Sequence, residues 1–311
     1  MTRTIDFCIP FVGGGIRYLE YLINNIERTA SHSHRINFIV SYHTEDDLNI
    51  LRKSPAYERI SQTVMAPAFS GGIVFCSSAN HASAINTLAK ASAADIAIFS
   101  DYDMAFVYPN WDDLIERYFF TDNLDLCGVT YTPVWLQIQD PAFQQIIPAI
   151  KNTDLAKYQQ LPNLSFFCIK GDTLRKTFSS RLTHFDEFLS SGGLPFRIIN
   201  TPTLSAENNL PLGAMQWLDT GYELPELIRK KNIPYTIFPY VMLDQQTVLK
   251  DYIQYQQMDI ILRPEIFYSQ TEKVPFLCHF KKGTAKSGDG NIDIAFNKFT
   301  TAIEDFLKQI Q

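Results

Sequence analysis

The stretch ADIAIFSDYDMAFVYPNW, residues 94–111, places two acids directly after an apolar run. Its apolar run 95–100 has the length of a buried β-strand, and Asp101 and Asp103 follow directly, one residue apart. In a parallel sheet the carboxyl end of a strand opens into the crevice where ligands bind. Both side chains can point the same way from an extended segment, because alternate residues share a face. Two carboxylates that lie this near to each other repel unless a cation or a shared proton reduces the repulsion. The stretch therefore predicts a divalent-metal site.

A purely structural role is the alternative for the same acids. In that interpretation SDYD is a solvated turn, and Asp101 caps the helix that begins near Trp111. Sequence features elsewhere in the chain have to distinguish the metal-binding interpretation from the structural one.

The first half of the chain alternates short apolar runs with helical patterns, which indicates βαβ units and a largely parallel sheet flanked by helices. The predicted strands are 5–12, 35–42, 61–67, 72–77, 95–100, 125–132 and 164–170, and the predicted helices are 16–29, 45–53, 79–93, 110–119 and 172–179. The second half is less regular. Its predictions are a long loop at 190–215, a helix at 222–232, a strand at 234–240 and an amphipathic helix at 291–311.

Composition limits the classes of function. An apolar fraction of 46% and a charged fraction of 19% are those of a globular protein. No run approaches the roughly 20 apolar residues of a membrane helix, and the start is a poor signal peptide, so we expect a cytoplasmic protein without a transmembrane segment. A net charge of −6 argues against a nucleic-acid partner. The five cysteines are scattered singly, without a CxxC, which fits a reducing compartment.

The segment around the two acids resembles a known family. Residues 80–119 look like the central segment of GT-A glycosyltransferases, especially the large nucleotide-sugar-dependent family 2. That family runs an Asn-bearing helix, an apolar strand, a DXD motif and an Asn-Trp pair that opens the next helix. Here Asn86, the motif Asp101-Tyr102-Asp103 and the pair Asn110-Trp111 occur in that order.

Weaker matches extend the resemblance over roughly residues 4–285. FCIPFVGG followed by RYLEYLINNI is similar to the first strand and helix of the family, and INFIVSYHT to its second strand. The resemblance implies that the nucleotide is contacted by Pro10, Phe11, Val12, Ser41, Asn86, Asp101 and Tyr102. Ser41 stands where an acid of the family often reads the base, so the identity of the base stays open.

Two later segments supply further candidate residues. WLDTGYELPELIRKKNIPYTIFP resembles the family's acidic segment before a helix and a strand, which implies that Asp219 is the catalytic base, with Glu223 as the reserve. CHFKKGT is like the late histidine that closes the metal site, so His279 is the third predicted metal ligand, and Lys282 could meet the diphosphate. His81 could reach the same crevice from the first turn of its helix, although a capping role explains it equally well.

The resemblance implies a complete function. It predicts a GT-A (Rossmann-like) domain over residues 1–290, with a nucleotide-sugar-binding half at 1–120, an acceptor-binding half at 121–290 and a C-terminal helix at 291–311. The activity would be transfer of a hexose from a UDP- or GDP-linked sugar to a glycan or glycolipid, with Mn²⁺ or Mg²⁺ bound by Asp101, Asp103 and His279. Polysaccharide biosynthesis is the expected setting.

Two other functions fit parts of the sequence. A haloacid-dehalogenase-like phosphatase also ends an apolar strand in DxD, with Asp101 as nucleophile, and KGDTL offers a Gly-Asp pair, at Asp172, for Mg²⁺. In such enzymes, however, the DxD usually stands near the start of the domain. A non-catalytic nucleotide-sugar or glycan-binding protein is the other alternative, although it would have no need of a base.

Overall fold

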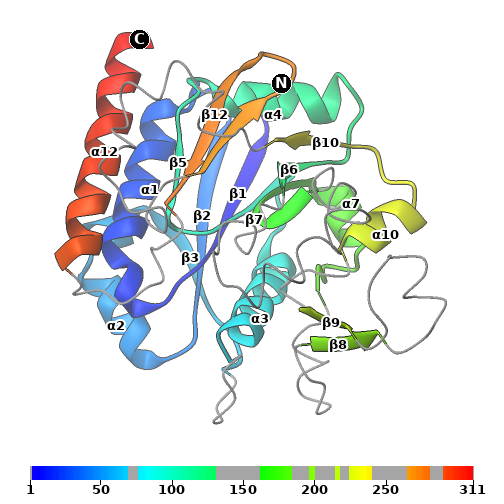
Figure 1. Ribbon diagram of the computed structural model, residues 1–311, viewed down its shortest axis with the longest axis horizontal. Helices are drawn as coiled ribbons and strands as arrows, with labels where there is room; N and C mark the ends of the chain where they lie inside the picture. Colours follow the sequence, from blue (N-terminus) through cyan, green and yellow to red (C-terminus); the bar gives the residue numbers. More distant parts are fainter. Residues whose placement is uncertain are drawn as a thin grey trace.

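Figure 1 shows the protein as a computed structural model, with helices packed on both faces of a central β-sheet. The structure describes residues 2–68, 76–130, 162–183, 196–199, 214–217, 224–239, 265–280 and 290–310.

Within these ranges, seven strands form the central sheet in the order β10-β6-β7-β4-β1-β2-β3. They are β1 Thr4–Pro10, β2 Arg35–Tyr42, β3 Ile60–Met65, β4 Ile96–Ser100, β6 Leu126–Thr130, β7 Pro162–Lys170 and β10 Tyr235–Phe238. Neighbouring strands run parallel, except that β7 is antiparallel to both β4 and β6. The predicted α/β class with a mostly parallel sheet is therefore confirmed.

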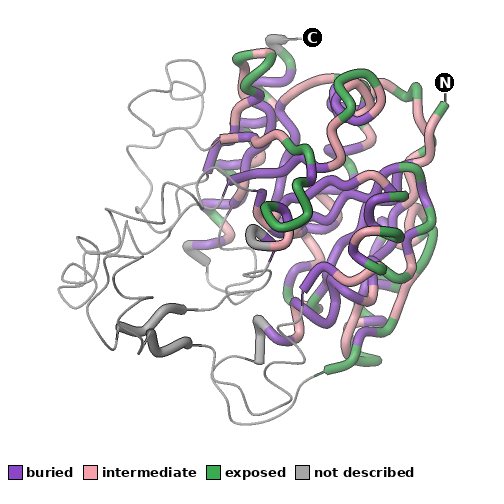
Figure 2. The backbone as a smooth tube through the Cα atoms, turned by 90° about the vertical axis from the view of Figure 1, so that its right-hand side faces the viewer, coloured by how far each residue is buried: buried purple, intermediate pink, exposed green. Residues whose placement is uncertain are grey.

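The helices cover the two faces of this sheet. They are α1 Ile16–Thr29, α2 Glu45–Lys53, α3 Cys76–Ala91, α4 Trp111–Phe120, α7 Gly171–Lys176, α10 Leu224–Lys230 and α12 Gly290–Ile310, with 3-10 turns η1 Gly13–Gly15 and η2 Pro55–Arg59. Buried residues of α1, α4 and α12 belong to one hydrophobic core, and those of α3, α7 and α10 belong to the other. Figure 2 shows buried stretches of backbone gathered inside the described part of the molecule, with exposed stretches around them.

The central position of β4 explains its apolar sequence. Every residue of the strand is buried. Ile96 and Ile98 belong to one core, while Ala97 and Phe99 belong to the other, because successive side chains of a strand point to opposite faces. A strand covered by helices on both sides has no face left for polar residues. The first charged side chain after it, Asp101, thus falls at the edge of the sheet.

A second, antiparallel sheet begins where β4 ends. Its strands are β5 Met104–Phe106, β12 Val274–His279 and β11 Glu265–Ser269, in the order β11-β12-β5. The segment Asp101-Tyr102-Asp103 is the link between β4 and β5, so it joins the two sheets. A separate pair is formed by β8 Phe196–Ile199 and β9 Ala214–Trp217.

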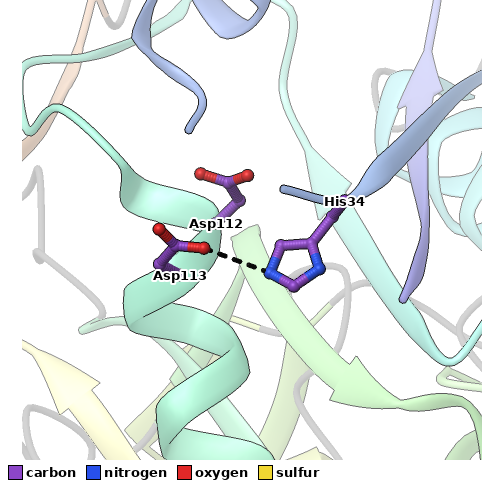
Figure 3. Close-up of side chains that lie close together, drawn as sticks. All are labelled: His34, Asp112 and Asp113. Atoms are coloured by element: carbon purple, nitrogen blue, oxygen red, sulfur yellow. Dashed lines mark ion pairs between the residues drawn. The ribbon is translucent and has the colours of Figure 1, made fainter. Parts of the chain in front are cut away.

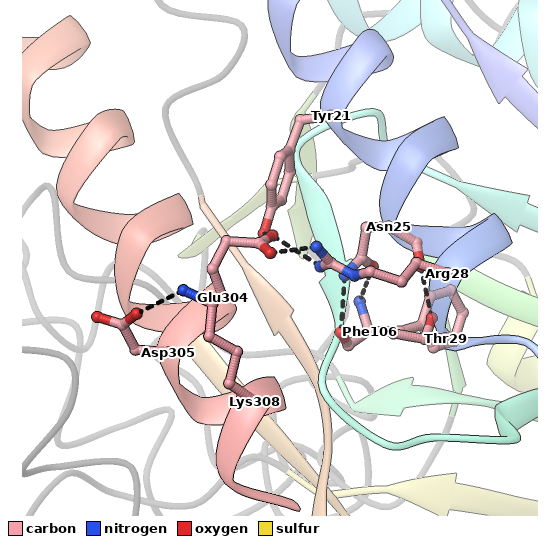
Figure 4. A network of polar contacts seen from close by, with 8 residues as sticks. All are labelled: Tyr21, Asn25, Arg28, Thr29, Phe106, Glu304, Asp305 and Lys308. Carbon is pink, nitrogen blue, oxygen red and sulfur yellow. Dashed lines mark hydrogen bonds and ion pairs between the residues drawn. The ribbon is translucent and has the colours of Figure 1, made fainter. Parts of the chain in front are cut away.

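The C-terminal helix α12 docks against α1, as Figure 4 shows. Glu304 of α12 accepts hydrogen bonds from Arg28 at 2.7 Å and from Tyr21 at 3.1 Å. One turn after Tyr21 on the same stripe of α1, Asn25 exchanges hydrogen bonds with the backbone of Phe106 in β5, at 3.0 and 2.6 Å. Helix α1 therefore connects α12 to the strand that follows the two acids.

Several predicted elements differ from the structure. The strand predicted at 72–77 is wrong over its last residues, because α3 already begins at Cys76, and the rest of it lies outside the described residues. A short apolar run does not by itself distinguish a strand from a buried helix. The loop predicted at 190–215 contains β8 and the start of β9. The division into halves at residue 120 stays a prediction.

Candidate active site

The two acids lie where the sequence predicts them, at the carboxyl end of β4. The backbone N–H of Asp101 donates to the carbonyl of Ser165 in β7 at 2.9 Å, which holds the start of the link against the sheet. The Asp101 side chain is 28% exposed, and that of Asp103 is 4% exposed. A carboxylate as buried as Asp103 needs a charged or hydrogen-bonding partner to offset its desolvation.

His279 is that partner, and the second sheet brings it there. In the pairing of β12 with β5, His279 lies opposite Met104. The next backbone N–H, that of Phe280, donates to the carbonyl of Asp103 at 2.8 Å, so the ladder continues beyond β5 to the acid itself. The imidazole Nε2 lies 3.2 Å from Oδ1 of Asp103.

A third carboxylate, which no sequence pattern indicated, completes this arrangement. Glu265 lies directly opposite His279 in the pairing of β11 with β12, and its Oε2 is 3.1 Å from the imidazole Nδ1. Burial alone would lower the pKa of His279, but the charges and hydrogen bonds of Asp103 and Glu265 raise that pKa to about 10. The metal-free imidazole is therefore a cation held between two carboxylates.

These side chains form a donor set that fits a divalent cation. One possible ligand atom from each of Asp101, Asp103 and His279 lies within 4.8 Å of the other two. Carboxylate oxygens suit Mg²⁺ and Mn²⁺, and imidazole suits several transition metals, so two carboxylates with one imidazole are compatible with Mn²⁺. The structure thus brings together the residues predicted to bind the metal.

Helix α3 carries two other residues predicted to lie at the site, His81 and Asn86. The Nε2 atom of His81 is 3.2 Å from Oδ1 of Asp101, so His81 reaches the predicted crevice. Asn86 is 4% exposed, and its side chain holds the backbone of Leu182 and Thr183 through bonds of 2.7, 3.0 and 3.2 Å. A contact of Asn86 with a nucleotide stays a prediction.

The predicted nucleotide contacts gather at the ends of β1 and β2. Pro10 lies opposite Ser41, and the N–H of Phe11 donates to the Ser41 carbonyl at 3.0 Å. Val12, between the end of β1 and the turn η1, is 43% exposed. Within the described residues, the fully buried Ser41 hydroxyl has no hydrogen-bond partner. Such an orphaned group is one that a bound ligand could satisfy.

Tyr102, between the two acids, points into the protein. A Cβ added to Gly15 would lie 2.5 Å from the Tyr102 ring, so the turn η1 needs glycine there. Burial, followed by the charges of Asp103 and Asp101, raises the pKa of the phenol. Tyr102 also stacks on Tyr18 of α1 at 6.3 Å. The turn after β1 and the link between the two acids are therefore packed as one unit.

A second cluster of similar residues, His34, Asp112 and Asp113, lies at the start of α4 and is already tied into hydrogen bonds with neighbouring segments (Figure 3). The backbone N–H of Arg3 donates to Nδ1 of His34 at 3.3 Å, and Nε2 of the same ring lies 3.3 Å from Oδ1 of Asp113. Asp112 is fully buried, and both its oxygens accept from Ser31. The cluster holds α4 in place.

The sheet also separates the residues that a phosphatase would need. Strand β7 is antiparallel to β4, and its last residue, Lys170, lies opposite Ile96 at the start of β4. Asp172 follows Lys170, so it is at the opposite edge of the sheet from Asp101. Its carboxylate is 66% exposed and pairs with Arg175 and Lys176 of its own helix. The Gly-Asp pair is thus not near the DxD motif.

Three predicted site residues lie outside the described residues: Asp219, Glu223 and Lys282. Their roles stay predictions. Glu265 could have been found from the sequence only by recognising 265–279 as a hairpin, which would have placed it opposite His279.

No protein-family model matches the sequence, and no curated protein matches it either. Several solved structures of glycosyltransferases resemble the chain. A mannosyltransferase from Pyrobaculum calidifontis, in complex with GDP-Man and Mn²⁺, matches 99% of this chain and 74% of its own, with 9% identity and a TM-score of 0.40. Mouse xyloside xylosyltransferase 1 matches 76% of this chain and 84% of its own, with 10% identity and a TM-score of 0.42.

Glucosyl-3-phosphoglycerate synthase from Mycobacterium tuberculosis, in complex with Mn²⁺, UDP-Glc and phosphoglyceric acid, is a third similar structure. It matches 55% of this chain and 57% of its own, with 16% identity and a TM-score of 0.33. At these identities and TM-scores the likeness is too distant to carry a conclusion about function, so the side chains of the site must carry it.

Among the described residues, none of the helices has the length and apolar character needed to cross a membrane.

Proposed function

We propose that this protein is a metal-dependent glycosyltransferase, which transfers a hexose from a UDP- or GDP-linked sugar to a hydroxyl group of a glycan or glycolipid. The observation that supports it best is the meeting of Asp101, Asp103 and His279 at the carboxyl end of β4. That edge of a mostly parallel sheet is where ligands bind. The resemblance of residues 80–119 to GT-A enzymes gives the class of reaction.

In this proposal Asp103 and His279 bind Mn²⁺ or Mg²⁺ directly, and Asp101 contacts the ribose or, through water, the metal. The bound cation supplies Lewis-acid neutralisation of the charge that grows on the departing diphosphate. The chain's contribution is to fix the ligands. Asp103 and His279 are held by the backbone ladder of β5 and β12, so their side chains converge without a loop having to close.

The nucleotide would lie over the ends of β1 and β2. Pro10 and Phe11 are buried, so they would offer only their backbone, whereas the exposed side chain of Val12 would line the base and ribose. The hydroxyl of Ser41 would hydrogen-bond to the nucleotide. An ionised acid at position 41 would only accept a hydrogen bond, whereas a serine hydroxyl can donate or accept. Ser41 therefore does not select between a UDP- and a GDP-linked donor, and the base stays open. Lys282 would meet the diphosphate.

The acceptor side depends on a carboxylate that takes the proton from the attacking hydroxyl. Asp219 is the proposed base and Glu223 is the reserve. A general base of this kind contributes roughly 10²- to 10⁴-fold to the rate. Retention of a base would also distinguish an enzyme from a protein that only binds the nucleotide sugar.

A thermal-shift screen of nucleotides and nucleotide sugars, with and without Mn²⁺, tests the proposal. We expect stabilisation by a uridine or guanosine diphosphate sugar that needs the metal, since a ligand that binds only the folded state raises its stability. The hits would then be incubated with the protein and analysed for released nucleoside diphosphate. Phosphate release from a generic aryl phosphate would favour a phosphatase, and a donor left intact over hours would favour a binding protein.

A further inference from the structure

We propose that Glu265 is a positioning residue for the metal site. It would accept the Nδ1 proton of His279 and thereby fix the tautomer and orientation that present Nε2 to the cation. This inference rests on the proposed function, because it assumes that His279 is a metal ligand. Glu265 was not expected from the sequence, and it touches neither the cation nor the substrate in this proposal.

The geometry of two consecutive contacts, which join three side chains, points to this role. Oε2 of Glu265 is 3.1 Å from Nδ1 of His279, and Nε2 of the same ring is 3.2 Å from Oδ1 of Asp103. The two nitrogens of the ring therefore face carboxylates on opposite sides. A cation held by Asp103 needs the lone pair of Nε2, so the single proton of the neutral ring must be on Nδ1. Glu265 is placed to accept that proton.

Burial keeps water away from the contact between Glu265 and His279. The Glu265 side chain is 5% exposed and the His279 side chain is 12% exposed, so water competes little for Nδ1. Glu265 and His279 lie opposite each other on neighbouring antiparallel strands, which fixes their separation through the backbone. Ligating histidines usually donate their other N–H to such an acceptor, and loss of that acceptor typically lowers metal affinity 10- to 100-fold.

Two substitutions distinguish the loss of the hydrogen-bond acceptor from the loss of side-chain volume at position 265. Glu265→Met keeps a side chain of similar length in the buried position but removes the strong acceptor. Glu265→Gln retains a carbonyl oxygen that can accept from Nδ1. Glu272→Gln is the matched control, because Glu272 is in the same hairpin and pairs with Arg117, away from His279.

The experiment measures Mn²⁺ in two ways on the full chain. Electron paramagnetic resonance of free Mn²⁺, with UDP or GDP present, gives the dissociation constant. Pulsed spectra of bound Mn²⁺ show whether a histidine nitrogen is coordinated, and His279→Ala identifies that signal. Neither reading depends on catalytic turnover, and a loss of stability alone would not remove the nitrogen signal from the bound metal.

We expect wild type and Glu272→Gln to bind Mn²⁺ alike, with the nitrogen signal. Glu265→Met should raise the dissociation constant by roughly 10- to 100-fold and weaken that signal. Glu265→Gln should restore most of both. Wild-type affinity and an unchanged nitrogen signal in Glu265→Met would overturn the positioning role of Glu265 and leave the proposed metal site in place. Failure of wild type to bind Mn²⁺ with either nucleotide would overturn the metal site itself, and the inference with it.

Discussion

Removing the Phe296 ring should loosen the metal site from a distance. Phe296 of α12 is 4% exposed and lies edge-on to Tyr18 at 4.4 Å and 5.4 Å from the Phe280 ring. Tyr18 in turn stacks on Tyr102, which stands between the two acids, and Phe280 follows His279. The helix therefore contacts the residues next to the metal ligands.

The size of the effect follows from burial. Phe-to-Ala substitutions in a core cost about 3–5 kcal/mol, so Phe296→Ala should lower the free energy of unfolding by that amount and the melting temperature by about 5–8 °C. Metal affinity should fall as well, by roughly 2- to 30-fold, if the coupling is of the usual 0.5–2 kcal/mol. Denaturant unfolding and Mn²⁺ titration measure the two quantities separately.

Phe306→Ala is the control for this prediction. Phe306 is in the same helix and 5% exposed, about three turns beyond Phe296. Its loss should destabilise the fold by a similar amount while leaving Mn²⁺ affinity unchanged. Equal affinities in the two variants, whether both reduced or both normal, would refute a coupling through Tyr18 and Phe280.

Two further predictions concern the turn after β1 and the base. Gly15→Ala should weaken metal-dependent nucleotide binding, measured by calorimetry, because its Cβ would displace the Tyr102 ring. Gly13→Ala should weaken this binding less, because its Cβ would meet mainly the flexible end of a side chain. Weaker binding by Gly13→Ala than by Gly15→Ala would contradict this prediction. Asp219→Asn should keep folding and donor binding while turnover falls by roughly 10²- to 10⁴-fold. If Glu223→Gln loses turnover instead, Glu223 is the base.

The sequence predicted the part of the site that lies within one short stretch of the chain, Asp101 to Asp103. Asp101 and Asp103 could be placed because the apolar run of β4 is followed directly by the acids, and the end of a parallel strand is a known position for ligands. His279 was predicted by resemblance, 176 residues after Asp103. Nothing local in the sequence indicates that β12 pairs with β5, a strand from Met104 to Phe106 that is too short to give a pattern.

Glu265 escaped prediction for a related reason. A buried acid in the apolar segment EIFYS has no sequence signature, because its only cue is the partner across the hairpin. The error at 72–77 has a different cause. GIVFCS is apolar and β-branched, but its end joins the long alanine-rich helix α3, and helical continuity decided the conformation from Cys76 onward.

Metal-dependent nucleotide binding is tested by calorimetric titration of UDP and GDP into the wild-type protein and Asp103→Asn, each with Mn²⁺ and with EDTA. We expect one nucleotide to bind the wild type only when Mn²⁺ is present, and Asp103→Asn to lose this binding while remaining folded. Equal binding by the wild type with Mn²⁺ and with EDTA would contradict this expectation.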